Sequence, residues 1–267
     1  MKKGIVLLAM LAVVFSCVGI AAAGELGTSV SAEYKTRSML YGIDTLQDDD
    51  GVFTPSATID LWGTGFSATI VGKWATEGEH VDDEELDYTL AYDFSLMKDE
   101  SAQTDVTLNY TYYDFYRQDS QQRDFYETGA KFAMPNIIGN NVVPYYRLVF
   151  LEPIANGEQG DAGLDSPYDL RGFLHIIGVD YTMNLECPMS ETKQPIVFGA
   201  STVFNDGWGY ENVDHDWSHA TFEVKAPIAD VLGGTLTPSV AYQVTMEDTV
   251  NDDQDEIIFG IKYTYAF

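Results

Sequence analysis

The chain has 267 residues and a formal net charge of −28 at pH 7, with 14 lysines and arginines against 42 aspartates and glutamates. So acidic a chain excludes a surface that attracts nucleic acid. Its cysteines are Cys17 and Cys187. Once a leader carrying Cys17 is removed, a single cysteine remains, and this excludes a disulfide framework.

The first 23 residues are typical of a secretory signal peptide. Residues 1–3 are short and basic, residues 4–20 are apolar, and three alanines follow at 21–23. Small residues in that position suit cleavage. The alternative is a membrane-anchoring helix, which the alanine exit disfavours. We therefore expect export, cleavage after Ala23, and one folded domain over 24–267.

The rest of the chain consists of short runs in which apolar and polar residues alternate, separated by polar stretches rich in Gly, Asp and Asn. Alternation with a period of two is the pattern of a strand that has one apolar and one polar face. About twelve such segments, an even number, predict an all-β protein, a transmembrane antiparallel β-barrel. The expected strands are 26–39, 52–61, 66–74, 86–96, 104–115, 125–134, 142–151, 170–183, 196–204, 218–226, 235–244 and 256–267.

The connections between these strands alternate strictly between short and long, as in barrels with short periplasmic turns and longer outer loops. The short ones are 63–65, 97–103, 135–141, 184–195 and 227–234. The long, more polar ones are 41–51, 75–85, 116–124, 152–169, 205–217 and 245–255.

The last strand shows the pattern best, because Ile257 and every second residue after it are large and apolar, up to the terminal Phe267. A terminal aromatic residue serves as an assembly signal in bacterial outer-membrane barrels, which predicts the barrel-assembly machinery as a partner. Aromatic residues near the expected strand ends suit the two interfacial girdles of such a barrel. They are Trp62, Trp74, Tyr112, Tyr113, Phe115, Tyr116, Trp217, Tyr263 and Tyr265.

A likeness to a known group is carried by short motifs at 34–42, 53–55, 62–74, 85–92, 235–242 and the final strand ending in Phe267. In these motifs the chain resembles small bacterial outer-membrane porins of the TorF type and their uncharacterised relatives. The resemblance implies a barrel in the outer membrane that forms a channel. An arginine often found at the first strand–loop junction of that group falls near Arg37 here, slightly displaced, and no role is transferred to it.

The charges separate by location when they are placed on the expected strands. Acidic clusters at 48–50, 82–85 and 252–255 fall in outer loops, whereas most of the scarce lysine and arginine falls on inward faces. The inward face also includes Glu127 and Lys131. The residues that we expect to line the lumen are Glu33, Lys35, Arg37, Asp60, Lys73, Asp87, Arg147, Glu256 and Lys262.

These features predict a porin-like channel for passive diffusion of small solutes or ions, with a mild cation preference because its mouth is acidic. Twelve strands lie between the filled eight-strand barrels and the open ones with sixteen or more, so a narrow pore and a plugged lumen both stay open. The alternative function is a closed structural barrel whose acidic loops contact cations, lipopolysaccharide or partners.

Catalytic and metal-binding interpretations are weaker. His215 and His219 share one strand face and could hold a transition metal, yet loop histidines in a polar rim are more often solvated. The acidic loops supply oxygen ligands for Ca²⁺ but lack EF-hand spacing. His80 lies in a loop and His175 has outward parity, and neither adjoins a nucleophile. We expect no enzyme, no cofactor and no dedicated metal site.

Overall fold

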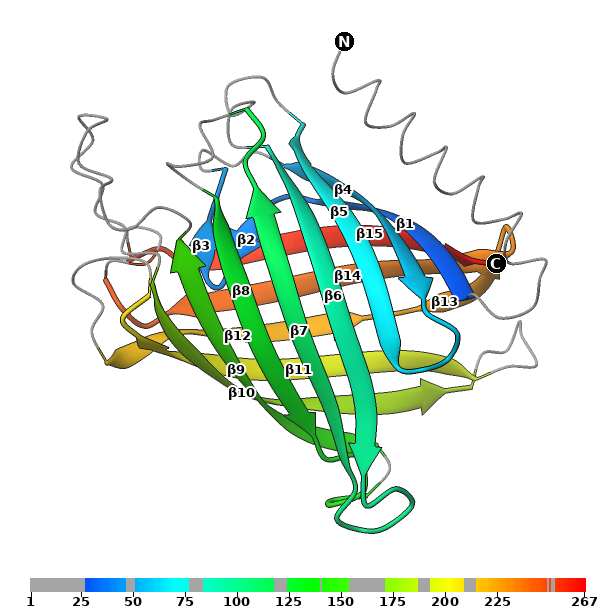
Figure 1. The fold of residues 1–267 in the computed structure, drawn as a ribbon. Coiled ribbons are helices and arrows are strands. Elements are labelled where there is room, and N and C mark those ends of the chain that lie inside the picture. Colours follow the sequence, from blue (N-terminus) through cyan, green and yellow to red (C-terminus); the bar gives the residue numbers. More distant parts are fainter. Residues whose placement is uncertain are drawn as a thin grey trace, which may run out of the picture.

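The protein is an antiparallel β-barrel (Figure 1). The computed structural model describes residues 27–46, 51–76, 84–117, 124–139, 141–153, 171–186, 193–208, 215–248, 250 and 253–267. No helix among these residues is long and apolar enough to cross a membrane. The predicted signal peptide, Cys187, His80 and most of the acidic loop clusters lie outside the described residues.

Twelve strands form the wall of the barrel, and the predicted fold class is confirmed. They are β1 (Gly27–Lys35), β4 (Val52–Asp60), β5 (Phe66–Ala75), β6 (Glu85–Leu96), β7 (Thr104–Asp114), β8 (Phe125–Ala133), β9 (Val142–Pro153), β10 (Gly172–Leu185), β11 (Gln194–Asp206), β12 (Asp216–Lys225), β14 (Gly234–Thr245) and β15 (Glu256–Ala266).

The barrel closes without a free edge. Each wall strand pairs antiparallel with its neighbours in the chain, and β12 also pairs with β14 beyond the short strand β13 (Ile228–Val231). The first and last strands join directly, with Val30 opposite Tyr265. Closure pairs the ladder groups that an open sheet would leave at its edges, which hydrocarbon surroundings require.

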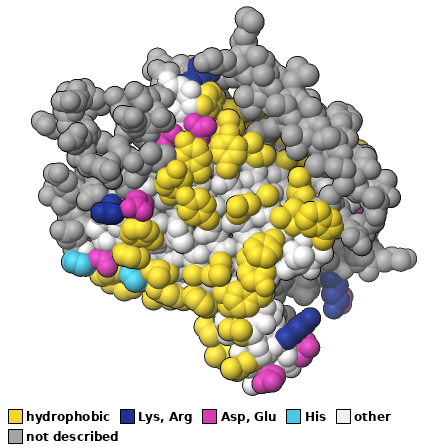
Figure 2. All heavy atoms as spheres, in the orientation of Figure 1, with side chains coloured by type: hydrophobic (Ala, Val, Ile, Leu, Met, Phe, Trp, Pro, Cys, Tyr) yellow, Lys and Arg dark blue, Asp and Glu magenta, His cyan; other side chains and the backbone are white. Residues whose placement is uncertain are grey.

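The two faces of the wall differ as the alternation predicts. In β15, Ile257, Phe259 and Ile261 are exposed on the outside, whereas Glu256 is buried inside. Figure 2 shows hydrophobic side chains across the middle of the visible face, with the charged side chains it colours near the edges. An apolar band of this extent exceeds the patches that water-soluble monomers expose, and it suits contact with lipid.

The first predicted strand was too long at its C-terminal end. β1 ends at Lys35, and the chain then forms a two-strand hairpin of β2 (Met39–Leu40) and β3 (Ile43–Asp44), which we call the inner hairpin. The sequence predicted part of an outer loop here. Instead, the inner hairpin lies inside the barrel (Figure 1). Its turn residues Tyr41 and Gly42 form hydrogen bonds with side chains that point inward from β8, β9 and β14.

Two strands, β9 and β10, carry apolar residues on both faces, although a strand between lipid and a polar interior is expected to alternate. The structure gives the reason. Val149, Leu151, Leu174 and Ile176 point inward and belong to one buried cluster inside the barrel. This inner cluster consists of Tyr113, Phe115, Phe125, Val149, Leu151, Leu174, Ile176, Val203 and Trp208. Tyr113 and Phe115 were predicted for an interfacial girdle, and that assignment was wrong because both rings pack inside.

Candidate channel interior

Charged side chains on the inner wall are arranged as pairs, some across neighbouring strands and some within one strand. The β5–β6 register sets Lys73 opposite Glu85, and its ammonium bonds that carboxylate and lies 3.2 Å from Asp87. Lys35 lies 3.4 Å from Glu33, and both project inward from β1. Opposite charges on adjacent inward positions stabilise each other, so much of the inner charge is neutralised locally.

Glu127 on β8 is the centre of a buried hydrogen-bond network. Its carboxylate is only 1% exposed. It accepts hydrogen bonds from Tyr41 Oη at 2.7 Å, Tyr113 Oη at 2.6 Å, Asn109 Nδ2 at 2.8 Å and Arg147 Nη2 at 2.6 Å. Four hydrogen-bond donors, one of which is the Arg147 counter-ion, compensate for the cost of burying this charge.

The network holds Tyr41 at the tip of the inner hairpin. Besides donating to Glu127, the Tyr41 hydroxyl accepts a hydrogen bond from Arg147 Nη2 at 3.0 Å. Its ring lies under the Arg147 guanidinium and packs edge-on against Trp208, with 5.8 Å between ring centroids. Burial and the Glu127 carboxylate raise the pKa of the Tyr41 phenol well above its ordinary value, so the phenol stays protonated and donates.

The backbone of the inner hairpin touches the opposite wall at Gly42. Gln243 Nε2 on β14 donates to the Gly42 carbonyl at 2.8 Å. Gly42 has φ of +93°, and a Cβ there would lie 2.3 Å from His219 Nδ1 on β12. Only glycine fits both the backbone conformation and the close approach.

A second attachment holds the base of the inner hairpin. Arg37, which follows β1, lies 3.3 Å from Asp44 at the end of β3 and 2.9 Å from Glu256 at the start of β15. Leu40 and Ile43 pack against the inner cluster. The inner hairpin and the inner cluster together occupy part of the space inside the barrel.

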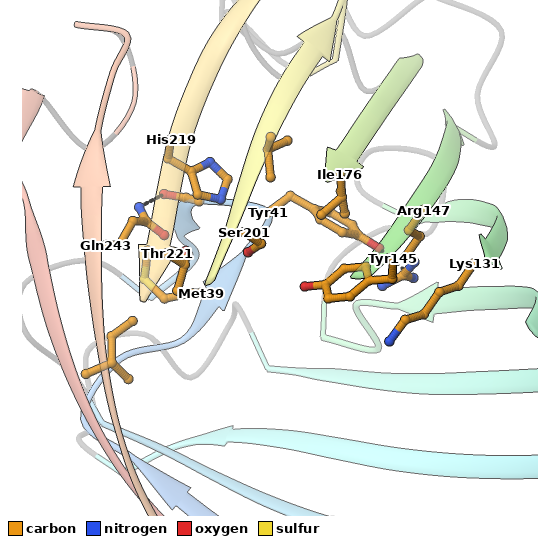
Figure 3. A pocket seen from close by; sticks show the side chains of 13 residues that line it. Met39, Tyr41, Lys131, Tyr145, Arg147, Ile176, Ser201, His219, Thr221 and Gln243 are labelled. Atoms are coloured by element: carbon orange, nitrogen blue, oxygen red, sulfur yellow. Dashed lines mark hydrogen bonds between the residues drawn. The ribbon is translucent and has the colours of Figure 1, made fainter. Parts of the chain in front are cut away.

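A cavity of about 320 Å³ lies beside the inner hairpin (Figure 3). Residues from seven wall strands, β8 to β12, β14 and β15, surround it together with the inner hairpin. Figure 3 shows Lys131, Tyr145 and Arg147 together on one side. The opposite side carries Gln243 and His219. The lining consists of Met39, Tyr41, Gly42, Lys131, Tyr145, Arg147, Ile176, Ser201, Val203, His219, Thr221, Gln243 and Ile258.

Apart from Asp60, the predicted lining residues fall into three groups. Arg147 is the one that borders the cavity, and it is also part of the Glu127 network. The structure places Arg37 in the turn after β1 rather than on the strand, because the chain leaves the wall there. The remaining predicted residues lie on wall strands and face the interior, as do the residues opposite them on the neighbouring strands. They are Glu33, Lys35, Lys73, Asp87, Glu256 and Lys262.

Asp60 has a local structural contact. It ends β4 at the short-turn side of the barrel, and its carboxylate accepts the backbone N–H of Gly63 at 3.0 Å. That bond supports the turn before β5, where Gly63 and Gly65 have positive φ. Glycine adopts such backbone conformations at little cost, which suits a tight turn.

Sequence reasoning missed the roles of Tyr41 and Gln243. Tyr41 was assigned to an outer loop, and nothing in its neighbourhood signals that it turns inward. Gln243 has inward parity on β14 but carries no charge. The sequence did carry one indication that residues pack inside the barrel, because β9 and β10 have apolar side chains on their inward faces as well as on their outward faces.

The two histidines that could have shared a metal site are separated by their surroundings. His219 faces inward beside Gly42, whereas His215 precedes β12, is exposed, and lies 2.7 Å from Asp206. Within the described ranges, no group of three or more His, Cys, Asp or Glu side chains is arranged to hold a metal ion. His175 faces outward and bonds Tyr146 at 2.8 Å.

Comparison with known proteins shows the fold. No family model and no curated protein match the sequence. Among solved structures, the KdgM porin aligns over 90% of this chain and 99% of its own, with 9% identity and a TM-score of 0.53. The NanC porin covers 89% and 98%, with 11% identity and a TM-score of 0.51. The COG4313 outer membrane channel from Pseudomonas putida F1 covers 91% and 96%, with 10% identity and a TM-score of 0.51. The chain therefore has the fold of a twelve-strand barrel of the outer-membrane porin type.

Proposed function

We propose that the protein is an outer-membrane channel for passive diffusion of small solutes or ions. The observation that carries the proposal is a closed barrel with an apolar outer surface, whose inner wall carries charged side chains and whose cavity is lined by polar as well as apolar residues. An apolar exterior is what lipid requires, and a polar interior is what a diffusing solute requires. The fold shared with porins supports this assignment.

A mild cation preference is part of the proposal. The chain carries 42 acids against 14 lysines and arginines, and the basic side chains on the inner wall are largely paired with carboxylates. The surplus acid should raise the local cation concentration near the mouth, within a Debye length of about 8–10 Å at physiological salt.

Location and assembly follow from the same proposal. Residues 1–23 would direct export, and the strand ending in Phe267 would be the segment engaged by the barrel-assembly machinery. The outer loops would face lipopolysaccharide, with divalent cations as bridging ions. The motifs shared with TorF-type porins support membership in that group.

The test is single-channel conductance of the refolded mature protein in a planar bilayer under a salt gradient. Stable current steps with a cation-favouring reversal potential are expected. Steps with an anion-favouring potential would reject the cation preference. The absence of current steps from a protein shown to be folded and inserted would reject the channel function.

The second candidate is a closed structural barrel with acidic, cation-binding outer loops. The observation that favours it is the packing of the inner hairpin and the inner cluster inside the barrel. This candidate predicts no conductance, together with a phenotype in envelope stability or adhesion when the outer loops are exchanged.

Membrane insertion makes a separate prediction. Phe259 on β15 is 58% exposed on the outer face, and a Phe259→Arg substitution should destabilise the folded state by up to about 2–4 kcal/mol in a bilayer. The control is Ala241→Arg, one row away on β14 but facing inward beside Glu223. Urea unfolding in lipid vesicles measures both, and equal losses would contradict the lipid-facing assignment of Phe259.

A further inference from the structure

Lys131 differs from most other basic residues on the inner wall. Lys35, Lys73, Arg147 and Lys225 each lie within ion-pair distance of a carboxylate. The Lys131 ammonium instead lies 4.3 Å from the centre of the Tyr145 ring, and it has no ion pair with any carboxylate in the described part of the chain. An ammonium that is partly removed from water without a counter-ion attracts an anion.

The positive charge of Lys131 borders the cavity beside the inner hairpin. Its lining contains two cations, Lys131 and Arg147, and no carboxylate. Glu127 pairs with Arg147 from behind the lining, and Glu223 is paired with Lys225 at 2.7 Å. Lys131 is therefore the cation in the lining that keeps its charge available to a solute.

The remaining polar groups of the lining suit a hydroxylated solute. Ser201 and Thr221 offer hydroxyls that donate and accept, and Tyr145 offers a phenol and a ring face. The space of about 320 Å³ lies at the small end of the ligand pockets found in proteins, which span about 300–1,000 Å³. The inner hairpin, through Tyr41 and Gly42, forms one wall and limits the size of what enters.

We propose that this cavity is a binding site for a small hydroxylated organic acid, whose carboxylate lies against the Lys131 ammonium. The proposal rests on the channel function, since it names a class of solute that pauses in the lumen. It is compatible with a cation preference at the mouth. Screened charge in the loops acts over a Debye length, whereas the Lys131 site acts through direct contact.

The test uses gluconate and sorbitol, which differ at one end by a carboxylate against an alcohol. Saturation-transfer difference NMR on the refolded protein in detergent micelles reports weak binding whether or not the barrel conducts. Failure of the channel and failure of this site are therefore distinguishable. Gluconate is expected to give a saturable signal and sorbitol at least several times less. Equal signals for the two would overturn the proposal, as would no gluconate signal.

Two charge-removing variants localise the site. Lys131→Met should abolish the gluconate signal. Lys262→Met removes the same charge from another inward position, which does not border the cavity, and it should leave the signal unchanged. Equal loss in both would show general electrostatic attraction and overturn the site. Lys131→Arg restores the charge and should restore binding, which separates lost charge from lost packing. Circular dichroism and the gel-mobility shift on heating establish that each variant is folded.

Discussion

Replacing the inner hairpin, Met39–Asp44, by a glycine–serine linker of equal length is expected to raise single-channel conductance severalfold. The hairpin lies inside the barrel beside the cavity and forms hydrogen bonds with side chains from β8, β9 and β14. Its removal should widen the lumen at this level, because the Tyr41 side chain no longer occupies the space beside Glu127 and Arg147. Planar-bilayer recordings of wild type and variant measure the effect, together with the largest polyethylene glycol that still enters the pore.

A point substitution tests the same element more gently. Gly42→Ala places a Cβ 2.3 Å from His219 Nδ1, so the hairpin tip has to move away from β12. Gly139→Ala is the matched control, because Gly139 also has positive φ, at +112°, but no atom lies within 4 Å of the added Cβ. Conductance should change in Gly42→Ala and stay at the wild-type value in Gly139→Ala. If the linker variant and Gly42→Ala both conduct as wild type does, the inner hairpin is not the constriction.

Arg147→Met is expected to destabilise the barrel by about 3–5 kcal/mol, since it leaves the buried Glu127 carboxylate without its counter-ion. It also removes a hydrogen bond to the Tyr41 hydroxyl, so the hairpin should loosen as well. Equilibrium unfolding by urea in lipid vesicles measures the loss. An increase in open-channel noise is the expected functional sign of the loosened hairpin.

The control for Arg147 is an exposed ion pair of the same chemistry. Arg171 Nη2 lies 2.6 Å from Glu152, but the two side chains are 64% and 45% exposed. Arg171→Met should cost no more than about 1 kcal/mol. The double variant Arg147→Met with Glu127→Leu should recover part of the stability, because no unpaired buried charge remains. A loss in the double variant as large as the sum of both single losses would contradict the coupling.

The position of each wall strand could be predicted from the sequence because alternation is a local property. Inward and outward residues repeat with a period of two, and lipid outside the barrel makes that repeat visible in almost every strand. The predicted starts and ends of most strands lie within a few residues of the observed ones, as for 66–74 against Phe66–Ala75. The parity of Ile257, Phe259 and Ile261 was predictable for the same reason.

The residues that pack inside the barrel could not be predicted from local alternation. Tyr41 and Glu127 are 86 residues apart, and Gly42 and Gln243 are 201 residues apart. The residues 41–51 have the polar composition of an outer loop, and no local pattern shows that their first part turns inward. The exclusion of Tyr113 and Phe115 from an interfacial girdle also depended on neighbours from other strands.

The sequence by itself thus determined the fold class, the wall strands, and which residues face inward, since these depend on alternation along each strand. Only the tertiary structure decided which inward charges are paired, which basic residues border a cavity, and which segment enters the lumen. Those outcomes depend on distances between side chains from different strands. Closure of the barrel sets those distances, and no single strand encodes them.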